Sequence, residues 1–376
     1  MLKVNLKKVI TRMRWLIYGS HGWIGRQLLN YFARDEDEII HGQSRLENFR
    51  DLKKEVKRVR PDRIISLTGR TRGPGYNSID YLEQPGKLQE NIRDNLLGPM
   101  NLAFVSNLHQ IHYTYMGTGC IFSGYPLEGF CEDDEPNFFG SSYSTVKGAT
   151  DMLITNFPNV LNIRIRMPIN DDLTDSNNFI TKIMSFPKIC SKYNSMSYLP
   201  DLLPILIDLS RQKITGTFNL VNPGLINHNQ ILTRLKRKLY PQLQWINITV
   251  EQQREMLLSD RSNNHLNTDL ISRYYPDVLN IQKTIENLIS RLEEKKFAED
   301  QGQNQEQDIS DGNHSDENSS ETESSLPLFS SLSHSETESS SEFSSEHLDE
   351  SSQIHDSVDP LENLIIQLEI LDTDPH

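Results

Sequence analysis

Cysteine is scarce in this sequence, and its three copies show no pairing pattern. Cys120, Cys131 and Cys190 are the only cysteines among 376 residues, and none belongs to a CxxC motif. An odd, sparse set of cysteines argues against a disulfide framework and against a thiolate-bound zinc ion. We therefore expect no metal site and a protein of a reducing compartment.

The chain also lacks long apolar runs. No stretch approaches the roughly 18 uninterrupted apolar residues from which a membrane span is recognised. The N-terminal extension, residues 1–13, is basic but has no apolar core of the kind found in a signal peptide. Both absences favour a cytoplasmic protein with no membrane contact.

Positive charge is missing from the C-terminal part. Residues 297–376 contain 21 Asp or Glu and no Lys or Arg; since the whole chain has 52 acidic and 38 basic residues, 31 acidic and all 38 basic residues remain in 1–296. The segment is rich in Ser, and such a composition buries too little apolar surface to offset chain entropy. It predicts a disordered acidic tail that does not bind nucleic acid. The apolar end of the tail, "PLENLIIQLEILD", either docks on an unknown protein partner or on the enzyme, or stays disordered.

Strands and helices alternate through the first half of the chain. Alternation of this kind predicts an α/β fold, a Rossmann-type doubly wound parallel sheet covered by helices on both faces. After Pro168 the alternation loosens, which indicates a smaller C-terminal substrate-binding lobe over 169–296 that completes the same catalytic unit as the Rossmann domain, 14–168. The strands expected in the Rossmann domain are 14–19, 38–42, 63–69, 111–117 and 160–168.

A glycine-rich turn, "GSHGWIG", joins the first expected strand to the first helix. Gly19, Gly22 and Gly25 form the pattern G-x-x-G-x-x-G. Glycines permit a sharp turn and close approach of a pyrophosphate, which then contacts free amides at the helix start, here Trp23 and Ile24. The turn predicts a dinucleotide cofactor; without a ligand it is only a tight turn.

The end of the second strand carries information about which cofactor binds. An acidic residue there accepts hydrogen bonds from the ribose 2′-hydroxyl of NADH and repels the 2′-phosphate of NADPH. The sequence has "HGQSRL" instead, with no acid and with Arg45 nearby. NADPH is therefore favoured over NADH, the alternative being that Arg45 is an ordinary solvated side chain.

Tyr143 and Lys147 in "YSTVK" stand four residues apart on an expected helix, and so on one face. An ammonium near the phenol is expected to lower the pKa of the tyrosine and to hold the nicotinamide ribose. The phenol then exchanges a proton with a carbonyl oxygen that receives hydride. Thr118 lies at the end of the preceding strand, where active sites of open α/β sheets lie. The three residues predict a reductase.

This arrangement is that of the extended short-chain dehydrogenase/reductase superfamily, and longer segments carry a closer resemblance over residues 14–290. They resemble the bifunctional nucleotide-4-keto-6-deoxyglucose 3,5-epimerase/4-reductases that complete nucleotide-L-rhamnose synthesis, and more distantly dTDP-4-dehydrorhamnose reductase and GDP-L-fucose synthase. The segments are "GTGCIFSG", "FFGSSYSTVKGATDML", "NVLNIRIRMPINDDLTDSNNFITKI", "FNLVNPGLINHNQIL" and "RSNNHLNTDLI".

The resemblance implies roles for further side chains. It assigns Thr118 to the substrate C4 oxygen beside Tyr143, and it makes Cys120 and Lys182 the acid/base pair of the epimerisation. A thiol, with an ordinary pKa near 8.5, is mostly protonated at neutral pH and can deliver a proton. The residue-based alternatives are a small buried hydrophobe for Cys120 and a solvated helix lysine for Lys182. The other two cysteines are expected to be structural.

Substrate contacts are expected from residues in the same segments: Arg166 and Arg261 as cations for the nucleotide diphosphate, and Asn178 and Phe179 along the sugar pocket. "GRTRGPGYNSIDYLE" departs from the family pattern and leaves open the roles of Arg70 and Arg72. No residue decides between uridine and deoxythymidine nucleotides.

Three functions stay open at this point. The first is conversion of UDP- or dTDP-4-keto-6-deoxy-D-glucose to the L-rhamnose nucleotide, with substrate supplied by a separate 4,6-dehydratase. The second is a 4-ketoreductase only, and the third an inactive sugar-reductase-like regulatory subunit. The intact Thr118, Tyr143 and Lys147 argue against the third. A homodimer is compatible with the sequence, which does not specify the oligomeric state.

Overall fold

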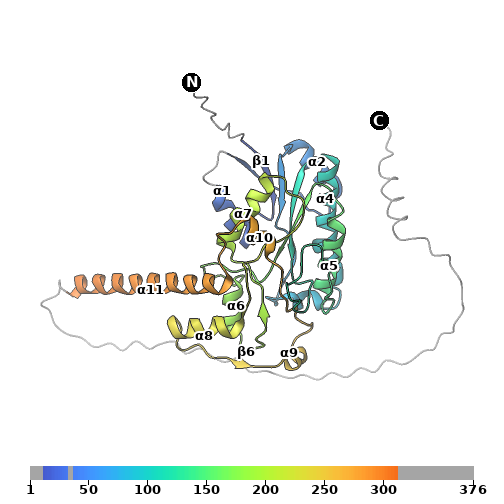
Figure 1. Cartoon of the computed structure of the whole chain (residues 1–376). Coiled ribbons are helices and arrows are strands. Elements are labelled where there is room, and N and C mark those ends of the chain that lie inside the picture. Colours follow the sequence, from blue (N-terminus) through green and yellow to red (C-terminus); the bar gives the residue numbers. More distant parts are fainter. Residues whose placement is uncertain (1–11, 33–36, 312–376) are drawn as a thin grey trace, which may run out of the picture. The chain divides into compact units, whose positions relative to one another are not determined.

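The computed structural model of the protein describes residues 12–32 and 37–311, with side chains described up to residue 299. Figure 1 shows a layered α/β body from which one long helix projects. Residues 1–11 of the N-terminal extension and residues 312–376 of the predicted acidic tail lie outside the described residues.

A six-stranded sheet with every strand parallel to its neighbours forms the centre of this body. The strand order is β2-β1-β3-β4-β5-β8, which confirms the predicted Rossmann-type parallel sheet. The strands are β1(Arg14–Tyr18), β2(Glu38–His41), β3(Arg63–Ser66), β4(His112–Thr118), β5(Val160–Ile165) and β8(Gly216–Asn219).

Side chains of each strand alternate between two apolar layers, as the pleat of a strand requires. In β1, Trp15 and Ile17 belong to one core, and Leu16 and Tyr18 to the other. The first core is closed by α1(Trp23–Phe32), α7(Leu199–Arg211) and α10(Asp269–Tyr274). The second is closed by α2(Phe49–Val59), α4(Gly98–Leu108) and the end of α5(Ser142–Ile154). Both faces of the sheet are therefore covered (Figure 1).

The sixth strand of the sheet comes from the part of the chain after Pro168. β8 lies within 169–296, the range expected for the substrate lobe, and pairs with β5 through the register Leu161↔Gly216 to Arg164↔Asn219. α7 also packs into the core beneath the main sheet. Local periodicity does not reveal which distant strands pair. The pairing shows that residues before and after Pro168 contribute to one sheet.

A third apolar core lies outside the sheet layers, within the expected substrate lobe. Its buried side chains come mainly from three helices, and Ile231, Ile285 and Leu288 are fully buried there. The helices are α6(Phe179–Ser185), α8(His228–Lys238) and α11(Ile281–Asp311). Short elements complete the lobe: β6(Lys188–Ile189), β7(Tyr193–Asn194), β9(Ile226–Asn227), β10(Ile246–Asn247) and α9(Val250–Met256).

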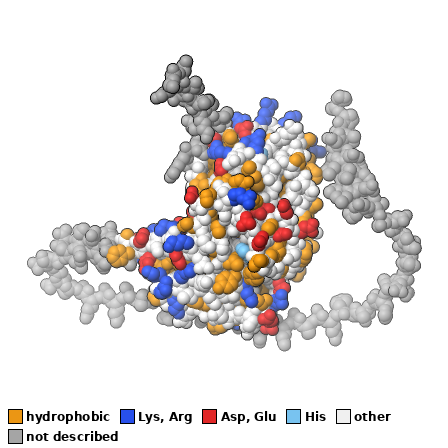
Figure 2. Space-filling model, in the orientation of Figure 1, with side chains coloured by type: hydrophobic (Ala, Val, Ile, Leu, Met, Phe, Trp, Pro, Cys, Tyr) orange, Lys and Arg blue, Asp and Glu red, His pale blue; other side chains and the backbone are white. Residues whose placement is uncertain are grey.

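The helix α11 continues well past residue 296, the last residue before the predicted acidic tail. Residues 297–311 are rich in Glu, Gln and Asp. Adding such residues to an existing helix costs little free energy, because each added residue contributes one hydrogen bond. Figure 2 shows basic and acidic side chains interleaved around α8 and α11; the ion pairs Arg234–Glu286 and Lys238–Glu293 join these two helices.

Three short helical segments connect β3 to α4 and reach toward the N-terminus of α5. They are η1(Ile79–Glu83), α3(Leu88–Ile92) and the π-helical turn η2(Arg93–Leu97). None of the helices in the described part of the chain combines the length and apolar character that a bilayer crossing requires.

Candidate active site

The glycine turn between β1 and α1 has the shape that a dinucleotide requires. Gly19 has φ +76°, a conformation that favours glycine. A Cβ on Gly25 would lie 2.3 Å from the Gly19 carbonyl oxygen, so only glycine lets the helix start so close to the turn. Trp23 and Ile24 are the first residues of α1. The free amides at this helix start, with the positive end of the helix dipole, fit a pyrophosphate.

The residues after β2 place Arg45 on the surface. Its side chain is 71% exposed and pairs with Glu47 at 3.0 Å. The last residue of β2 is His41, whose ring stacks on His21 at a centroid distance of 5.1 Å and whose Nδ1 lies 2.8 Å from the Ser20 hydroxyl. The sequence reasoning overlooked the two histidines, although His41 stands where an acidic residue would select NADH.

One buried acid, Glu55, is bonded to the backbone of this turn. The Glu55 carboxylate accepts hydrogen bonds from the amides of Gln43 and Ser44, both at 2.9 Å, and from the Tyr18 hydroxyl. These bonds lower the pKa of Glu55 against the effect of its burial. Glu55 thus holds the turn after β2 and does not stand free for a ribose hydroxyl.

Thr118, Cys120 and Tyr143 meet at the carboxyl end of β4. Thr118 is the last residue of β4, and Tyr143 lies in the first turn of α5. Cys120 packs against a small apolar cluster made by Tyr143 together with Tyr81 and Leu82 of η1. Tyr143 and Thr118 are each only 7% exposed. The predicted reductase residues and the predicted epimerase thiol therefore share one site.

Cys120 lies in a turn, because β4 ends before it. The Thr118 hydroxyl oxygen accepts a hydrogen bond from the Cys120 amide at 3.1 Å. The Cys120 carbonyl accepts one from the Ser144 hydroxyl of α5 at 2.7 Å. The thiol is thus carried by a short turn that is tied to both the strand and the helix.

Glu83 fixes the start of α5, and the sequence reasoning missed it. Both its carboxylate oxygens accept from the Ser142 amide, at 2.9 and 3.1 Å, and one also accepts from the Ser142 hydroxyl at 3.0 Å. A carboxylate at a helix N-terminus is favoured by the free amides and by the helix dipole. It fixes the first turn of α5, and with it Tyr143.

The pKa of Tyr143 is raised, whereas the sequence predicted that Lys147 would lower it. Burial is the largest cause, and the nearby Cys120 acts in the same direction; hydrogen bonding with Thr118 opposes them. In this structure the Lys147 ammonium instead donates to the Tyr115 hydroxyl of β4, with a longer contact of 3.4 Å to the Met116 carbonyl. The phenol of Tyr143 is therefore held protonated, which suits a proton donor.

Lys147 is itself buried, with 5% of its surface exposed. Burial lowers its pKa to about 8, although the charges of Asp151 and Cys120 oppose the shift. Asp151 in turn forms a buried ion pair with Arg164, at 2.6 Å. A lysine with a pKa lowered in this way is suited to proton transfer, and its predicted partnership with Tyr143 stays a prediction.

This shift makes the stability of the fold depend on pH. From about pH 8 to 10 the unfolded chain keeps a proton on Lys147 that the folded chain has lost, so folding becomes more favourable as pH rises. Between pH 7.5 and 10, we expect the free energy of unfolding of the wild type to rise by up to about 3 kcal/mol more than that of Lys147→Met. Urea unfolding at a series of pH values measures this difference, with Lys295→Met of α11 as the exposed control; a flat difference for Lys147→Met would contradict it.

Lys182 lies on α6 and is partly buried. Its pKa is lowered, first by burial and then by the charge of Arg72, while Asp175 opposes the shift. Arg72 thus acts on the candidate base. Arg70 has a different environment: its Nε contacts Asp94 and lies 3.7 Å from Glu90, so it is part of an ion-pair network.

Two of the residues expected to bind substrate lie at the start of α6. Asn178 is fully buried and caps this helix by accepting from the Ile180 amide at 3.0 Å. Its amide nitrogen donates to the Asn170 side chain and to two carbonyls. Phe179 packs against the core of the substrate lobe and lies 5.4 Å from the ring of His228. The structure thus gives Asn178 a capping role at the start of α6, and its contact with substrate stays a prediction.

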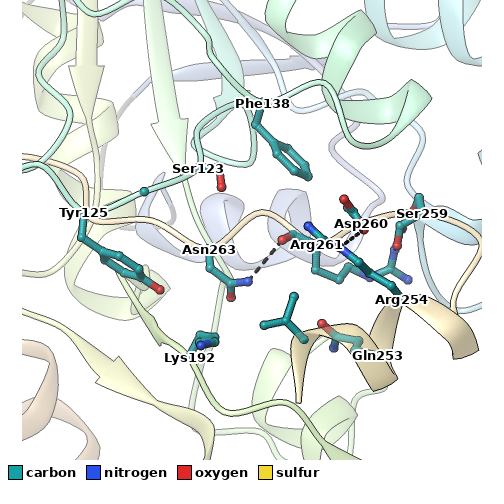
Figure 3. A pocket seen from close by; sticks show the side chains of 12 residues that line it. Ser123, Tyr125, Phe138, Lys192, Gln253, Arg254, Ser259, Asp260, Arg261 and Asn263 are labelled. Atoms are coloured by element: carbon teal, nitrogen blue, oxygen red, sulfur yellow. Dashed lines mark hydrogen bonds and ion pairs between the residues drawn. The ribbon is translucent and has the colours of Figure 1, made fainter. Parts of the chain in front are cut away.

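A pocket of about 220 Å³ is lined in part by Ser123, Gly124 and Tyr125, which follow the Cys120 turn in the chain (Figure 3). Arg261, one of the predicted substrate cations, lines it and contacts the Asp80 carboxylate of η1. Arg254 pairs with Asp260 at 2.8 Å, and Lys192 lies on the opposite side in Figure 3. The sequence reasoning did not single out Arg254 or Lys192, because nothing local indicates that α9 and the segment before β7 face the same cavity.

The other predicted cation, Arg166, directly follows β5 and is 1% exposed. Its Nη1 donates to the Cys120 sulfur at 3.4 Å and to the Ser262 hydroxyl at 3.0 Å, and its Nη2 contacts Ser262 and Asn194. Arg166 lies against the candidate thiol, and a direct contact with substrate stays a prediction.

Comparison with known proteins places this site in a family, although no protein-family model matches the chain. The chain is 49% identical over 286 residues to protein L780 of Acanthamoeba polyphaga mimivirus, covering 74% of this chain and 99% of L780. A crystal structure of L780, described as a UDP-rhamnose synthase, matches with a TM-score of 0.72 at 48% identity, again over 74% of this chain and 99% of that one.

Two Arabidopsis thaliana proteins extend the comparison. The chain is 35% identical to a bifunctional dTDP-4-dehydrorhamnose 3,5-epimerase/dTDP-4-dehydrorhamnose reductase, covering 72% of this chain and 90% of the relative. It is also 35% identical to a trifunctional UDP-glucose 4,6-dehydratase/UDP-4-keto-6-deoxy-D-glucose 3,5-epimerase/UDP-4-keto-L-rhamnose-reductase, of whose length it spans 41%. The Rossmann sheet, the Tyr143–Lys147 helix and the Cys120 turn therefore belong to a member of the family of bifunctional nucleotide-4-keto-6-deoxyglucose 3,5-epimerase/4-reductases.

Proposed function

We propose that this protein converts UDP- or dTDP-4-keto-6-deoxy-D-glucose to the corresponding L-rhamnose nucleotide, by epimerisation at C3 and C5 followed by NADPH-dependent reduction at C4. The observation that carries the proposal is the position of Cys120, which lies two residues after Thr118 and packs beside Tyr143. A ketone reductase needs the tyrosine and the threonine, but it has no use for a thiol at this place.

The thiol has a role if carbon centres must be inverted. A ketone at C4 acidifies the hydrogens on C3 and C5, so a base can remove either one to leave an enolate. Lys182 is the candidate base, because its lowered pKa makes the neutral amine more available. Cys120 is the candidate acid: its S–H bond breaks, a C–H bond forms on the opposite face, and the C4 carbonyl is restored.

Reduction uses the neighbouring groups. The bound dinucleotide supplies hydride to C4. Tyr143, whose raised pKa keeps it protonated, donates a proton to the C4 oxygen, and Thr118 orients that oxygen by a hydrogen bond. We assign Lys147, one helical turn after Tyr143 on α5, to the nicotinamide ribose, as the family resemblance implies.

The pocket shown in Figure 3 is the proposed site of the substrate's nucleotide diphosphate. Arg261, Arg254 and Lys192 supply positive charge, and Phe138 and Tyr125 supply aromatic faces for a base. The chain connects this pocket to the thiol directly, since Ser262 lies next to Arg261 and contacts the arginine that touches Cys120.

A preference for NADPH rests on the turn after β2. A hollow of about 460 Å³ is lined there by Ser44, Arg45, Lys54 and Arg58 among others, and His41 stands at the position of an NADH-selecting acid. Arginine, serine and imidazole N–H groups all suit a 2′-phosphate. The Arg45–Glu47 pair is exposed to solvent, so a phosphate can compete for the guanidinium at small cost.

Binding measurements test this preference without turnover. We expect the wild type to bind NADPH about tenfold more tightly than NADH, Arg45→Ala to reduce that ratio, and His41→Asp to reverse it by offering a carboxylate to the ribose 2′-hydroxyl. Lys57→Ala, a change at an exposed lysine of α2 that does not line this hollow, serves as the control. Equal affinities of the wild type for both cofactors would contradict the preference.

The function itself is tested by incubating the purified protein and NADPH with UDP- or dTDP-4-keto-6-deoxy-D-glucose and identifying the product. We expect an L-rhamnose nucleotide with deuterium at C3 and C5 when the reaction runs in deuterated water. No NADPH consumption with either substrate would overturn the proposal. The same assay compares the two nucleotides, which the residues of the pocket do not distinguish.

The proposed substrate implies a supplier. A 4-keto-6-deoxy sugar arises when a 4,6-dehydratase removes water from a nucleotide hexose, and we propose that a separate protein performs this step. A homodimer stays a prediction, and the expected protein partner of the tail concerns residues outside the described ones.

A further inference from the structure

Two buried arginines stand two residues apart at the end of β5, and they differ in the groups that balance their positive charge. Arg164 pairs with the Asp151 carboxylate at 2.6 Å. Arg166 donates to the Gly119 carbonyl, to Ser262 and to Asn194, all uncharged acceptors, and to the Cys120 sulfur. Within the described ranges no carboxylate forms an ion pair with Arg166.

An unpaired buried cation is costly, since burial removes the water that stabilises its charge. Burial indeed lowers the pKa of Arg166, and the groups that oppose the shift are Cys120 and Tyr125. Of these two, only Cys120 forms a hydrogen bond with the guanidinium, at 3.4 Å. The thiolate form of Cys120 is therefore the anion that can balance the buried charge of Arg166.

We propose that Arg166 is a positioning residue for Cys120, holding its sulfur toward the reaction and stabilising the thiolate that remains after proton delivery. The inference rests on the proposed function. When the S–H proton passes to the enolate carbon, the negative charge of the enolate ends on sulfur, 3.4 Å from Nη1. Arg166 stays protonated throughout, so the step moves one proton and leaves an ion pair.

Other titratable groups also face this pair. Tyr143 and Lys147 of α5 interact electrostatically with Cys120. Tyr81 of η1 packs in the same cluster. The positive charge of Arg166 lowers the pKa of His228 of α8, after the larger effect of burial. Lys147 is the second cation near the sulfur, but its ammonium is directed to Tyr115. A change at Arg166 is thus separable from a change at Lys147.

The first test follows the thiol itself. In a Cys131→Ser/Cys190→Ala background, which leaves Cys120 as the only cysteine, iodoacetamide labelling is measured from pH 6 to 10 with and without Arg166→Met. We expect labelling at pH 7.5 to be about tenfold slower in Arg166→Met, with the pH profile displaced upward, and Arg166→Lys to restore part of the rate. An unchanged profile in a folded Arg166→Met protein would overturn the inference.

A second test keeps Arg166 and so does not depend on the folding of its variants. Cys120→Asp places a carboxylate beside the guanidinium, and Cys120→Asn is its uncharged match. Burying a carboxylate normally destabilises a protein. Here we expect Cys120→Asp to melt about 3 °C or more above Cys120→Asn at pH 7.5. An equal or higher melting temperature for Cys120→Asn would mean that Arg166 needs no anion at this position, and would overturn the inference.

The two proposals fail in different experiments. If labelling depends on Arg166 but Cys120→Ala still exchanges solvent hydrogen at C3 and C5, the pair is real and the proposed acid role of Cys120 is lost. If Cys120→Ala abolishes exchange while labelling ignores Arg166, the function stands and the positioning role is lost. Arg166→Met is expected to slow the exchange and to leave NADPH binding unchanged, because Arg166 lies at the thiol and not at the glycine turn.

Discussion

Cys120→Ala is expected to lower the rate of hydrogen exchange at C3 and C5 by about 10²–10⁴-fold, the range that a positioned general acid contributes. Removal of the sulfur leaves the enolate without a proton donor on the face where inversion must end. The exchange is followed by mass spectrometry or NMR of the nucleotide sugar in deuterated water. NADPH binding should be unaffected, because the thiol lies in the turn after β4 and the glycine turn follows β1.

The matched control for this variant is Cys131→Ala. Cys131 is also a partly exposed cysteine in a loop, but its sulfur contacts only the Gly129 carbonyl, at 3.9 Å, and burial raises its pKa. It should exchange at the wild-type rate. Full formation of the L-rhamnose nucleotide by Cys120→Ala would show that Cys120 acts only as a small buried apolar residue. It would also favour the alternative of a protein that only reduces C4.

Tyr143→Phe should produce the opposite pattern. Loss of the hydroxyl removes the proton donor for the C4 oxygen, so the rate of reduction should fall by about 10²–10⁴-fold. Exchange at C3 and C5 should continue, because Cys120 and Lys182 remain. The phenol is 7% exposed and packs on Tyr81 and Leu82, and phenylalanine preserves this packing.

NADPH oxidation measured by absorbance, beside the exchange assay, separates the two activities of Tyr143→Phe. Tyr81→Phe is the control: its hydroxyl donates to Glu90 at 2.9 Å, away from the site, so reduction should proceed at nearly the wild-type rate. Rapid reduction by Tyr143→Phe would contradict the assigned proton donor. Loss of both activities would indicate instead that the hydroxyl organises the whole site.

Local sequence was sufficient for much of the fold and for part of the site. Alternating strands and helices predicted the parallel sheet, since side-chain periodicity is a property of each element alone. Gly19, Gly22 and Gly25 lie within one turn, and Tyr143 and Lys147 within one helix, so spacing along the chain nearly equals spacing in space. The resemblance of longer segments added Cys120 and Lys182.

Tertiary packing decided what local spacing cannot contain. Whether Lys147 or burial controls the pKa of Tyr143 depends on how many atoms cover the phenol, and in this fold burial outweighs the lysine, whose ammonium turns to Tyr115. The pairing of β8 with β5 likewise joins segments about 55 residues apart in the chain.

The sequence by itself determined a Rossmann reductase with an additional thiol at the end of β4. Only the tertiary structure decided what surrounds that thiol. Arg166 is 46 residues from Cys120 and Ser262 is 96 residues from Arg166, yet the three meet with the arginine wholly buried. The physical reason is the cost of burying a charge: a cation enclosed by the fold is balanced by groups that only the fold brings within reach.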